Sequence, residues 1–196
     1  MLEGPLLWFV NRGTGVVLLV LLTLSTLLGV VSTRIRGGRV PQFAYQHLHR
    51  NLGLISVLLL AVHAASAVVD TFVDIRWWQV FVPWGGTYKP VWLALGALAL
   101  DLIVAVVLTS LLRRRLPHLG WRAVHVLAYA AWAVAVAHGL GIGTDAQSPW
   151  SVWVTVGCVA VVTLALTARL VGLISDRWRP APVRSRADAK RWGQRS

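Results

Sequence analysis

Acidic residues and cysteine are scarce in this 196-residue chain, which has seven Asp and Glu against nineteen Lys and Arg and a single cysteine, Cys158. One cysteine cannot close an internal disulfide, supply the thiolates of an iron–sulfur cluster or build the Cys-x-x-Cys-His motif of covalent haem attachment. No Gly-x-Gly-x-x-Gly follows a strand pattern, so the sequence predicts no flavin or nicotinamide site within it. Charged residues reach only 13%, well below the usual share in soluble domains.

Long apolar runs dominate the chain, which is 57% hydrophobic. Five runs have about 20 residues or more, enough to cross a bilayer. Because backbone polar groups find no water partners in lipid, we predict that each run is a helix. The expected fold is an all-α, polytopic transmembrane bundle of about five spans, with a membrane domain over residues 1–175 and a basic cytoplasmic tail, disordered, over 176–196. The predicted spans are 7–31, 45–70, 91–112, 121–140 and 150–175.

The net charge of +12 is distributed as a topology signal rather than as a nucleic-acid surface. Basic residues concentrate in alternate connections and in the tail, whereas the remaining connections carry Asp70, Asp74 and Asp145. By the positive-inside rule the basic connections are cytoplasmic. We therefore expect a multi-pass protein of the plasma membrane, in contact with lipid, with its N-terminus outside and its C-terminus cytoplasmic. The basic residues of the predicted cytoplasmic connections are Arg34, Arg36, Arg39, Arg113, Arg114, Arg115 and Arg122, whereas the outer connections carry only Arg76 and Lys89.

Aromatic residues mark the predicted membrane interfaces. The longest outer connection, 71–90, is rich in tryptophan, and we expect it to fold onto the outer mouth of the bundle with a short interfacial helix ended by Pro83. Six of the eleven tryptophans are typical of an aromatic belt: Trp8, Trp77, Trp78, Trp84, Trp121 and Trp150.

Four histidines occur as two pairs inside two different runs: His49 with His63, and His125 with His138. Their spacings of 14 and 13 residues correspond to about 21 Å and about 20 Å along a helix. Since the two runs cross the membrane in the same direction, one histidine of each pair lies near the cytoplasmic side and the other towards the outer side. Two neutral imidazoles can ligate one haem iron and leave it no open position. The pattern therefore predicts two haems stacked across the membrane within the bundle.

The two spacings differ in their helical phase. Fourteen residues keep His49 and His63 on one face, whereas thirteen place His125 and His138 about 140° apart on an ideal helix. Either the two haems are rotated relative to one another about the bundle axis, or the fourth helix departs from ideal winding. Gly53 lies four residues after His49 and therefore on the same helix face. Because glycine has no side chain, it leaves room for a flat ring beside that histidine.

Several further polar residues fall inside or at the ends of the runs. Asp101 lies mid-span, where it is either protonated and hydrogen-bonded to a neighbouring helix or part of a proton path. His47 and His118 do not fit the two levels, and we expect them to face solvent. Three arginines could bind haem propionates or equally snorkel to lipid headgroups, namely Arg50 and Arg122 at the cytoplasmic level and Arg12 at the outer level.

His-Arg-x-x-Gly at 49–53 followed by His63, and Trp-Arg-x-x-His at 121–125 followed by His138, resemble the ligand helices of the ferric-reductase-like transmembrane domain family. Its superfamily includes NADPH oxidase membrane cores and the haem subunit of the methionine sulfoxide reductase system. Short motifs at 22–25, 109–115 and 143–145 look like those of the short bacterial, actinobacterial-type members, and the resemblance covers most of residues 8–175. It implies two b-type haems. By position, His49 and His125 would share the cytoplasmic haem, and His63 and His138 the outer one.

The sequence therefore predicts a transmembrane electron-transfer oxidoreductase subunit that moves electrons between two haem b groups. Eukaryotic relatives usually have six spans and a fused flavin and nicotinamide domain, neither of which this sequence predicts. We expect a separate electron donor, either a reductase protein or a quinol, and an outer-side acceptor that the sequence does not identify, so iron as the acceptor stays open. Two alternatives also stay open: a histidine-based metal-ion or proton transporter, and a haem-containing structural or sensor subunit.

Overall fold

A computed structural model describes residues 5–32, 41–70 and 73–177 of the chain. Over these residues it is all-helical and has no strand. Five of its helices are long and apolar enough to cross a membrane, which confirms the predicted all-α, polytopic fold. The elements are α1 (Pro5–Ser32), α2 (Gln42–Val69), the 3-10 helix η1 (Trp77–Val80), α3 (Pro90–Leu111), α4 (His118–Ile142) and α5 (Pro149–Arg177).

Proline sets the start of every long helix. The first residue of α1, α3 and α5 is a proline, and Pro41 and Pro117 directly precede α2 and α4. Proline suits these places because its fixed φ favours the helix and its missing N–H would have no partner in the first turn. Pro117 also explains one wrong expectation: His118, predicted to lie in a loop, is the first residue of α4. His118 and His47 are exposed, as predicted.

The helix ends adjoin segments that are not described. The predicted tail was expected to be disordered from residue 176, but α5 continues to Arg177, so the boundary was placed too early. The rest of that tail, 178–196, lies outside the described residues, as do Arg34, Arg36 and Arg39 of the first predicted cytoplasmic connection. The topology argument therefore rests on Arg113, Arg114, Arg115 and Arg122 within the described part.

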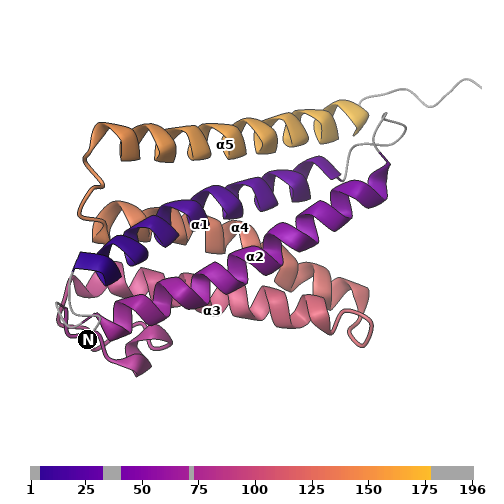
Figure 1. The fold of residues 1–196 in the computed structure, drawn as a ribbon. Helices are drawn as coiled ribbons and strands as arrows, with labels where there is room; N and C mark the ends of the chain where they lie inside the picture. Colours follow the sequence, from indigo (N-terminus) through magenta and orange to yellow (C-terminus); the bar gives the residue numbers. More distant parts are fainter. Residues whose placement is uncertain (1–4, 33–40, 71–72, 178–196) are drawn as a thin grey trace, which may run out of the picture.

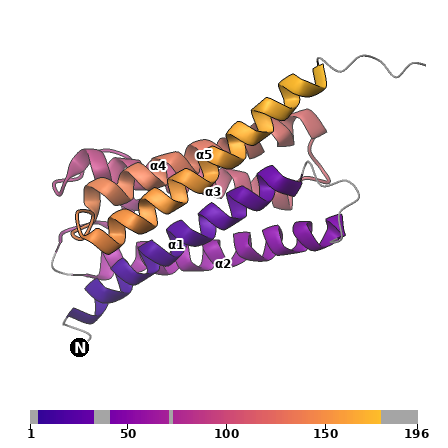
Figure 2. The same ribbon diagram turned by 90° about the horizontal axis from the view of Figure 1, so that it is seen from above.

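Two antiparallel hairpins form the bundle. Helix α1 packs along α2, and α3 packs along α4, while α1 also contacts α4 and α5 (Figure 1). Helix α5 lies along one side of the bundle (Figure 2). One end of the molecule gathers the start of α1, η1 and the α4–α5 connection, and the other end gathers the α3–α4 connection and the end of α5. The five helices thus alternate in direction, and α2 and α4 run the same way.

Polar contacts hold the end of the α3–α4 hairpin and the neighbouring connection that carries η1. The Lys89 ammonium donates to the Gly141 carbonyl oxygen over 3.0 Å, so a cation satisfies the C-terminal carbonyls of α4. Lys89 itself adopts a left-handed φ of 39° immediately before Pro90. A short helix is present in this connection as the single turn of η1, but it ends at Val80 and not at the predicted Pro83. The buried Gln79 amide holds this turn by donating to the Gly85 carbonyl oxygen over 2.9 Å.

The helices α2 and α4 are not among the described pairs whose backbones pack closely. The buried apolar side chains of the bundle are few and mostly of small or medium size, including Leu18, Ala97, Ala131 and Val162. Histidine rings of the two helices lie opposite one another in two pairs.

Candidate functional site

The four predicted histidines meet in two pairs across α2 and α4. The ring centres of His49 and His125 are 6.1 Å apart with the ring planes at 74°, and those of His63 and His138 are 6.5 Å apart at 90°. Each pair joins one residue of α2 to one residue of α4 at the same level of the bundle. This is the pairing expected from the sequence. Helix α4 runs without interruption through both of its histidines, which favours a rotation between the two levels over irregular winding.

The two rings of α2 are oriented by α1. His49 Nδ1 lies 2.9 Å from the Ser25 carbonyl oxygen, and His63 Nδ1 lies 3.0 Å from the Asn11 carbonyl oxygen. Because a carbonyl oxygen only accepts, Nδ1 carries a proton in both rings, and in the neutral imidazole Nε2 then keeps its lone pair. The hydroxyl of Ser25 lies 3.2 Å from the same Nδ1 of His49. Helix α1 therefore selects the tautomer of both α2 histidines.

Helix α3 orients the two rings of α4 in the same manner. His138 Nδ1 donates to the Trp92 carbonyl oxygen over 2.7 Å. His125 Nδ1 lies 3.4 Å from the Ser110 hydroxyl, a longer contact through a side chain. The hydrogen bonds described for the four rings thus all use Nδ1, and each partner lies on the helix packed beside the histidine. A metal-binding histidine shows this arrangement, since its second nitrogen is held by a carbonyl or another polar group.

Glycines make room for three of these rings. Gly15, Gly29 and Gly96 each follow the accepting carbonyl by four residues, which places them on the same face of the helix, beside the histidine. A Cβ added at Gly96 would lie 2.5 Å from His138 Cε1, and one at Gly15 would lie 3.2 Å from His63 Cε1. At Gly29 the corresponding distance to His49 Cε1 is 3.7 Å. Larger residues at Gly96 and Gly15 would displace the histidine rings.

The ring separations and the donor chemistry fit haem. Two imidazoles bound on opposite sides of one metal, each nitrogen about 2.0 Å from it, put their ring centres about 6.4 Å apart, whereas a tetrahedral pair puts them about 5.2 Å apart. The observed 6.1 Å and 6.5 Å match the first arrangement. Two neutral imidazoles with free Nε2 lone pairs are the ligand set that such an iron requires.

A site made of protein ligands alone is not evident. Across residues 5–32, 41–70 and 73–177, no group of three or more His, Cys, Asp or Glu side chains gathers closely enough to hold a metal ion. A zinc site needs at least three protein ligands, and each histidine pair supplies two. The described geometry therefore gives no support to the metal-transporter alternative.

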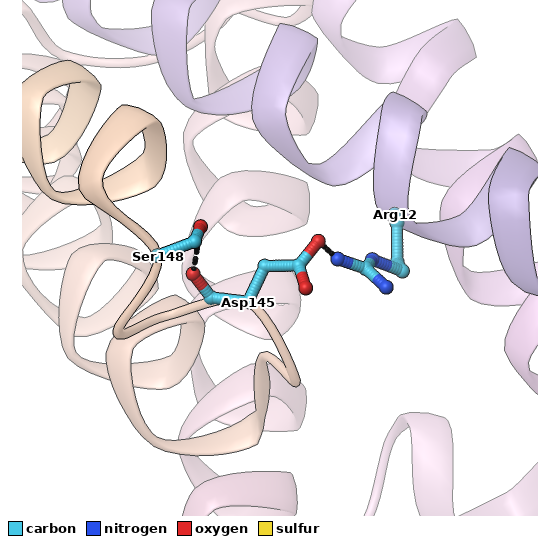
Figure 3. Close-up of polar contacts among 3 residues, drawn as sticks. All are labelled: Arg12, Asp145 and Ser148. Carbon is cyan, nitrogen blue, oxygen red and sulfur yellow. Dashed lines mark hydrogen bonds and ion pairs between the residues drawn. The ribbon is translucent and has the colours of Figure 1, made fainter.

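Arg12 has partners other than those predicted for it. Its guanidinium forms an ion pair with Asp145 of the α4–α5 connection, and Ser148 donates to the Asp145 backbone carbonyl (Figure 3). The guanidinium also lies over the Trp8 ring, 3.9 Å from its centre. Within the described contacts, Arg12 therefore ties the start of α1 to that connection. Its predicted role towards a haem propionate stays a prediction.

The other residues singled out in the sequence lie on α2, α3 and α4. Arg50 and Arg122 are exposed and follow or precede the ligand positions on α2 and α4. A Cβ at Gly53 would meet no atom within 4 Å, in agreement with an open side beside His49. Asp101 is half-buried in α3 and makes no hydrogen bond or ion pair with any described residue.

Sequence reasoning missed the residues that hold the histidines. Asn11 acts twice, because its backbone carbonyl accepts from His63 while its side-chain amide donates to the His63 carbonyl oxygen over 2.9 Å. Ser25, Trp92 and Ser110 also had no assigned role. A signal existed: Gly15 and Gly29 are 14 residues apart, as are His49 and His63.

Comparison with known proteins yields one match. The family model described as "Domain of unknown function (DUF8596)" matches residues 6–145, a span that includes the four histidines and most of α1 to α4. No curated protein matches the chain, and no solved structure does.

Proposed function

The chain belongs to the DUF8596 family, and we propose that it is a transmembrane electron-transfer subunit of the ferric-reductase-like type, a bis-histidine cytochrome with two b-type haems. One observation carries the proposal: two pairs of histidine rings, at two levels of the bundle, each with a ring separation suited to opposite axial ligands. His49 with His125 would hold the cytoplasmic haem, and His63 with His138 the outer one. Haem b, when bound, supplies one-electron oxidation and reduction of its iron.

The side chains of this protein have three tasks in that function. The backbone carbonyls of Asn11, Ser25 and Trp92 keep a proton on Nδ1 and so leave Nε2 to bind an iron. The apolar helices exclude water, so the dielectric around both levels is low. Two imidazoles would hold each iron, which favours electron passage over binding of a substrate at the metal.

The proposal includes a membrane and an orientation. The basic α3–α4 connection would face the cytoplasm, which places the His49 and His125 level on that side of the plasma membrane. Electrons would come from a separate reductase protein or a membrane quinol, since no flavin or nicotinamide motif occurs in the 196 residues. The acceptor would lie on the outer side.

A reduced-minus-oxidised spectrum of the purified protein, together with a count of haem per chain, tests the proposal. We expect a b-type α-band and two haems per chain. A His49→Ala and a His63→Ala variant should each lose about one haem, whereas His47→Ala, a matched change at an exposed histidine of the same helix, should keep both. Protein that is colourless as purified, or haem retained when all four ligands are replaced by alanine, contradicts the proposal. Metal uptake by colourless protein in liposomes would favour the transporter.

A further inference from the structure

Trp121 carries a buried donor that lacks an acceptor. Its indole Nε1 is inaccessible to solvent and is the one buried side-chain nitrogen or oxygen, among the described residues, without a hydrogen-bond partner. Leaving such a group unsatisfied costs about 1–3 kcal/mol, so orphaned donors in native structures call for an explanation. The sequence predicts that Trp121 belongs to an aromatic belt, in which this nitrogen would turn towards water and headgroups. In the structure the nitrogen is buried.

Trp121 lies beside the cytoplasmic histidine pair. It precedes His125 by one helical turn, and its ring stacks on the His125 ring with centres 5.0 Å apart and planes at 25°. The Arg113 guanidinium also lies over the indole ring, 5.9 Å from its centre. The unsatisfied N–H therefore belongs to a group that contacts a proposed haem ligand and has a cation beside it.

The groups around the Trp121 N–H indicate which kind of acceptor it would bind. An indole N–H can only donate, so the missing partner must be an acceptor. A neighbouring guanidinium favours an acceptor with negative charge, and hydrogen bonds to ionised acceptors are roughly twice as strong as neutral ones. A carboxylate within reach of a histidine-bound porphyrin satisfies both conditions, since the propionates are the porphyrin's anionic groups.

We propose that Trp121 Nε1 donates a hydrogen bond to a propionate of the haem held by His49 and His125, and that Arg113 balances the charge of that carboxylate. This inference rests on the proposed function and adds two residues, Trp121 and Arg113, to the cytoplasmic site. Trp121 acts here as a binding residue, because it would contact the cofactor itself.

Haemin and its dimethyl ester provide the test, because the ester has the same ring and iron but no carboxylate. The full chain, produced without haem and with His63 and His138 replaced by alanine, retains the cytoplasmic pair alone and is titrated with each compound optically. In this background Trp121→Phe keeps the ring and removes the N–H. We expect affinity for haemin to fall about 10- to 100-fold and affinity for the ester to change by about threefold or less.

Controls separate this inference from its premise. Trp153→Phe makes the same chemical change at a tryptophan of α5 that is 74% exposed, and it should leave both affinities unchanged. Equal losses for haemin and ester, or no loss for either, would overturn the inference, since Trp121 would then only pack against His125. Failure of the unmutated chain to bind haemin would instead overturn the proposed function.

A second measurement covers the case in which Trp121→Phe does not fold. In unmutated protein labelled with 15N-tryptophan, diamagnetic gallium protoporphyrin and its dimethyl ester exert the same ring-current effect on the Trp121 indole N–H, so the difference between the two shifts reports the carboxylate. We expect the resonance to lie further downfield with the free acid than with the ester, and equal shifts with both compounds would reject the hydrogen bond.

Discussion

Gly96→Ala gives the sharpest test of how the outer histidine pair is held. The added Cβ would lie 2.5 Å from His138 Cε1 and 2.7 Å from Nδ1, which no relaxed structure tolerates. The ring must therefore move, and its 2.7 Å hydrogen bond to the Trp92 carbonyl oxygen must lengthen or break. Backbone surrounds this contact on the α3 side, so most of the movement falls on the imidazole.

The expected cost follows from three contributions. Overpacking of a filled site costs about 1–3 kcal/mol, and the lost hydrogen bond about 0.5–1.5 kcal/mol. Replacing a helical glycine by alanine returns about 0.5–1 kcal/mol. The net cost of holding His138 in its present position is about 2 kcal/mol. This cost corresponds to a loss of about 30-fold in haem affinity at the site of His63 and His138.

A graded series of glycines makes the prediction specific. Gly15→Ala, with its Cβ 3.2 Å from His63 Cε1, should cost little, within about threefold in affinity, because the ring needs to yield by only a few tenths of an ångström. Gly29→Ala, at 3.7 Å from His49 Cε1, makes an ordinary contact and should be neutral for haem binding. Gly139→Ala is the matched control, because it follows His138 directly, is exposed and would meet no atom within 4 Å.

Haem titration of the haem-free chain, followed at the α-band after reduction, measures the two sites. The parent protein should bind two equivalents, and Gly96→Ala should bind one tightly and the second about 30-fold more weakly. Circular dichroism of each variant checks that the helices are intact. The reasoning is refuted if Gly96→Ala binds both equivalents as Gly29→Ala does, or if Gly139→Ala loses as much affinity as Gly96→Ala.

Three other predictions concern stability, each measured by thermal unfolding in detergent. Asn11→Ala removes donors to the His63 carbonyl oxygen and to Ser66 Oγ and should destabilise the protein by about 1–3 kcal/mol; unchanged stability would contradict the described contacts. A double-mutant cycle of Arg12→Gln and Asp145→Asn should give a coupling of about 0.5–1 kcal/mol, since the pair is partly exposed, and a coupling of zero argues against the ion pair. Asp101→Leu should stabilise the protein by about 2–3 kcal/mol, because the mid-span carboxyl has no described partner, and a loss of stability would reveal one.

The pairing of the histidines was predictable because it depends only on depth. Counting residues from each membrane face places His49 opposite His125 and His63 opposite His138, and the structure brings these same rings together. The fold was predictable for a similar reason, since each helix follows from the length of an apolar run. Helix ends were less predictable. Pro117 precedes α4, and the helix begins directly after it, at His118.

The support of the rings was not predictable in the same way. A backbone carbonyl of α1 has no sequence signature, so nothing identified Asn11 or Ser25 as the acceptor for a histidine on another helix. Arg12 was expected near the outer haem because of its depth, but its ion pair depends on where the α4–α5 connection places Asp145. Connections between helices follow no periodicity, and sequence patterns do not fix their three-dimensional course.

The two hairpins support their histidines in a similar way, and the unequal histidine spacings of α2 and α4 therefore affect one ring more than the others. In each hairpin the first helix offers a carbonyl and, four residues later, a small residue beside the ring. Gly96 follows Gly15 by 81 residues, and Ser110 follows Gly29 by the same number, so α1 and α3 keep equal intervals between their two support points.

The histidines on α4 are one residue closer together than those on α2. The mismatch must be absorbed at one of the two α4 histidines, and His125 is the one whose contact is the 3.4 Å side-chain hydrogen bond to Ser110 rather than a short bond to a carbonyl. The ring of Trp121 stacks on His125. His125 is therefore the least firmly oriented of the four rings, and it is also the one that an additional contact between Trp121 and the cofactor would stabilise most.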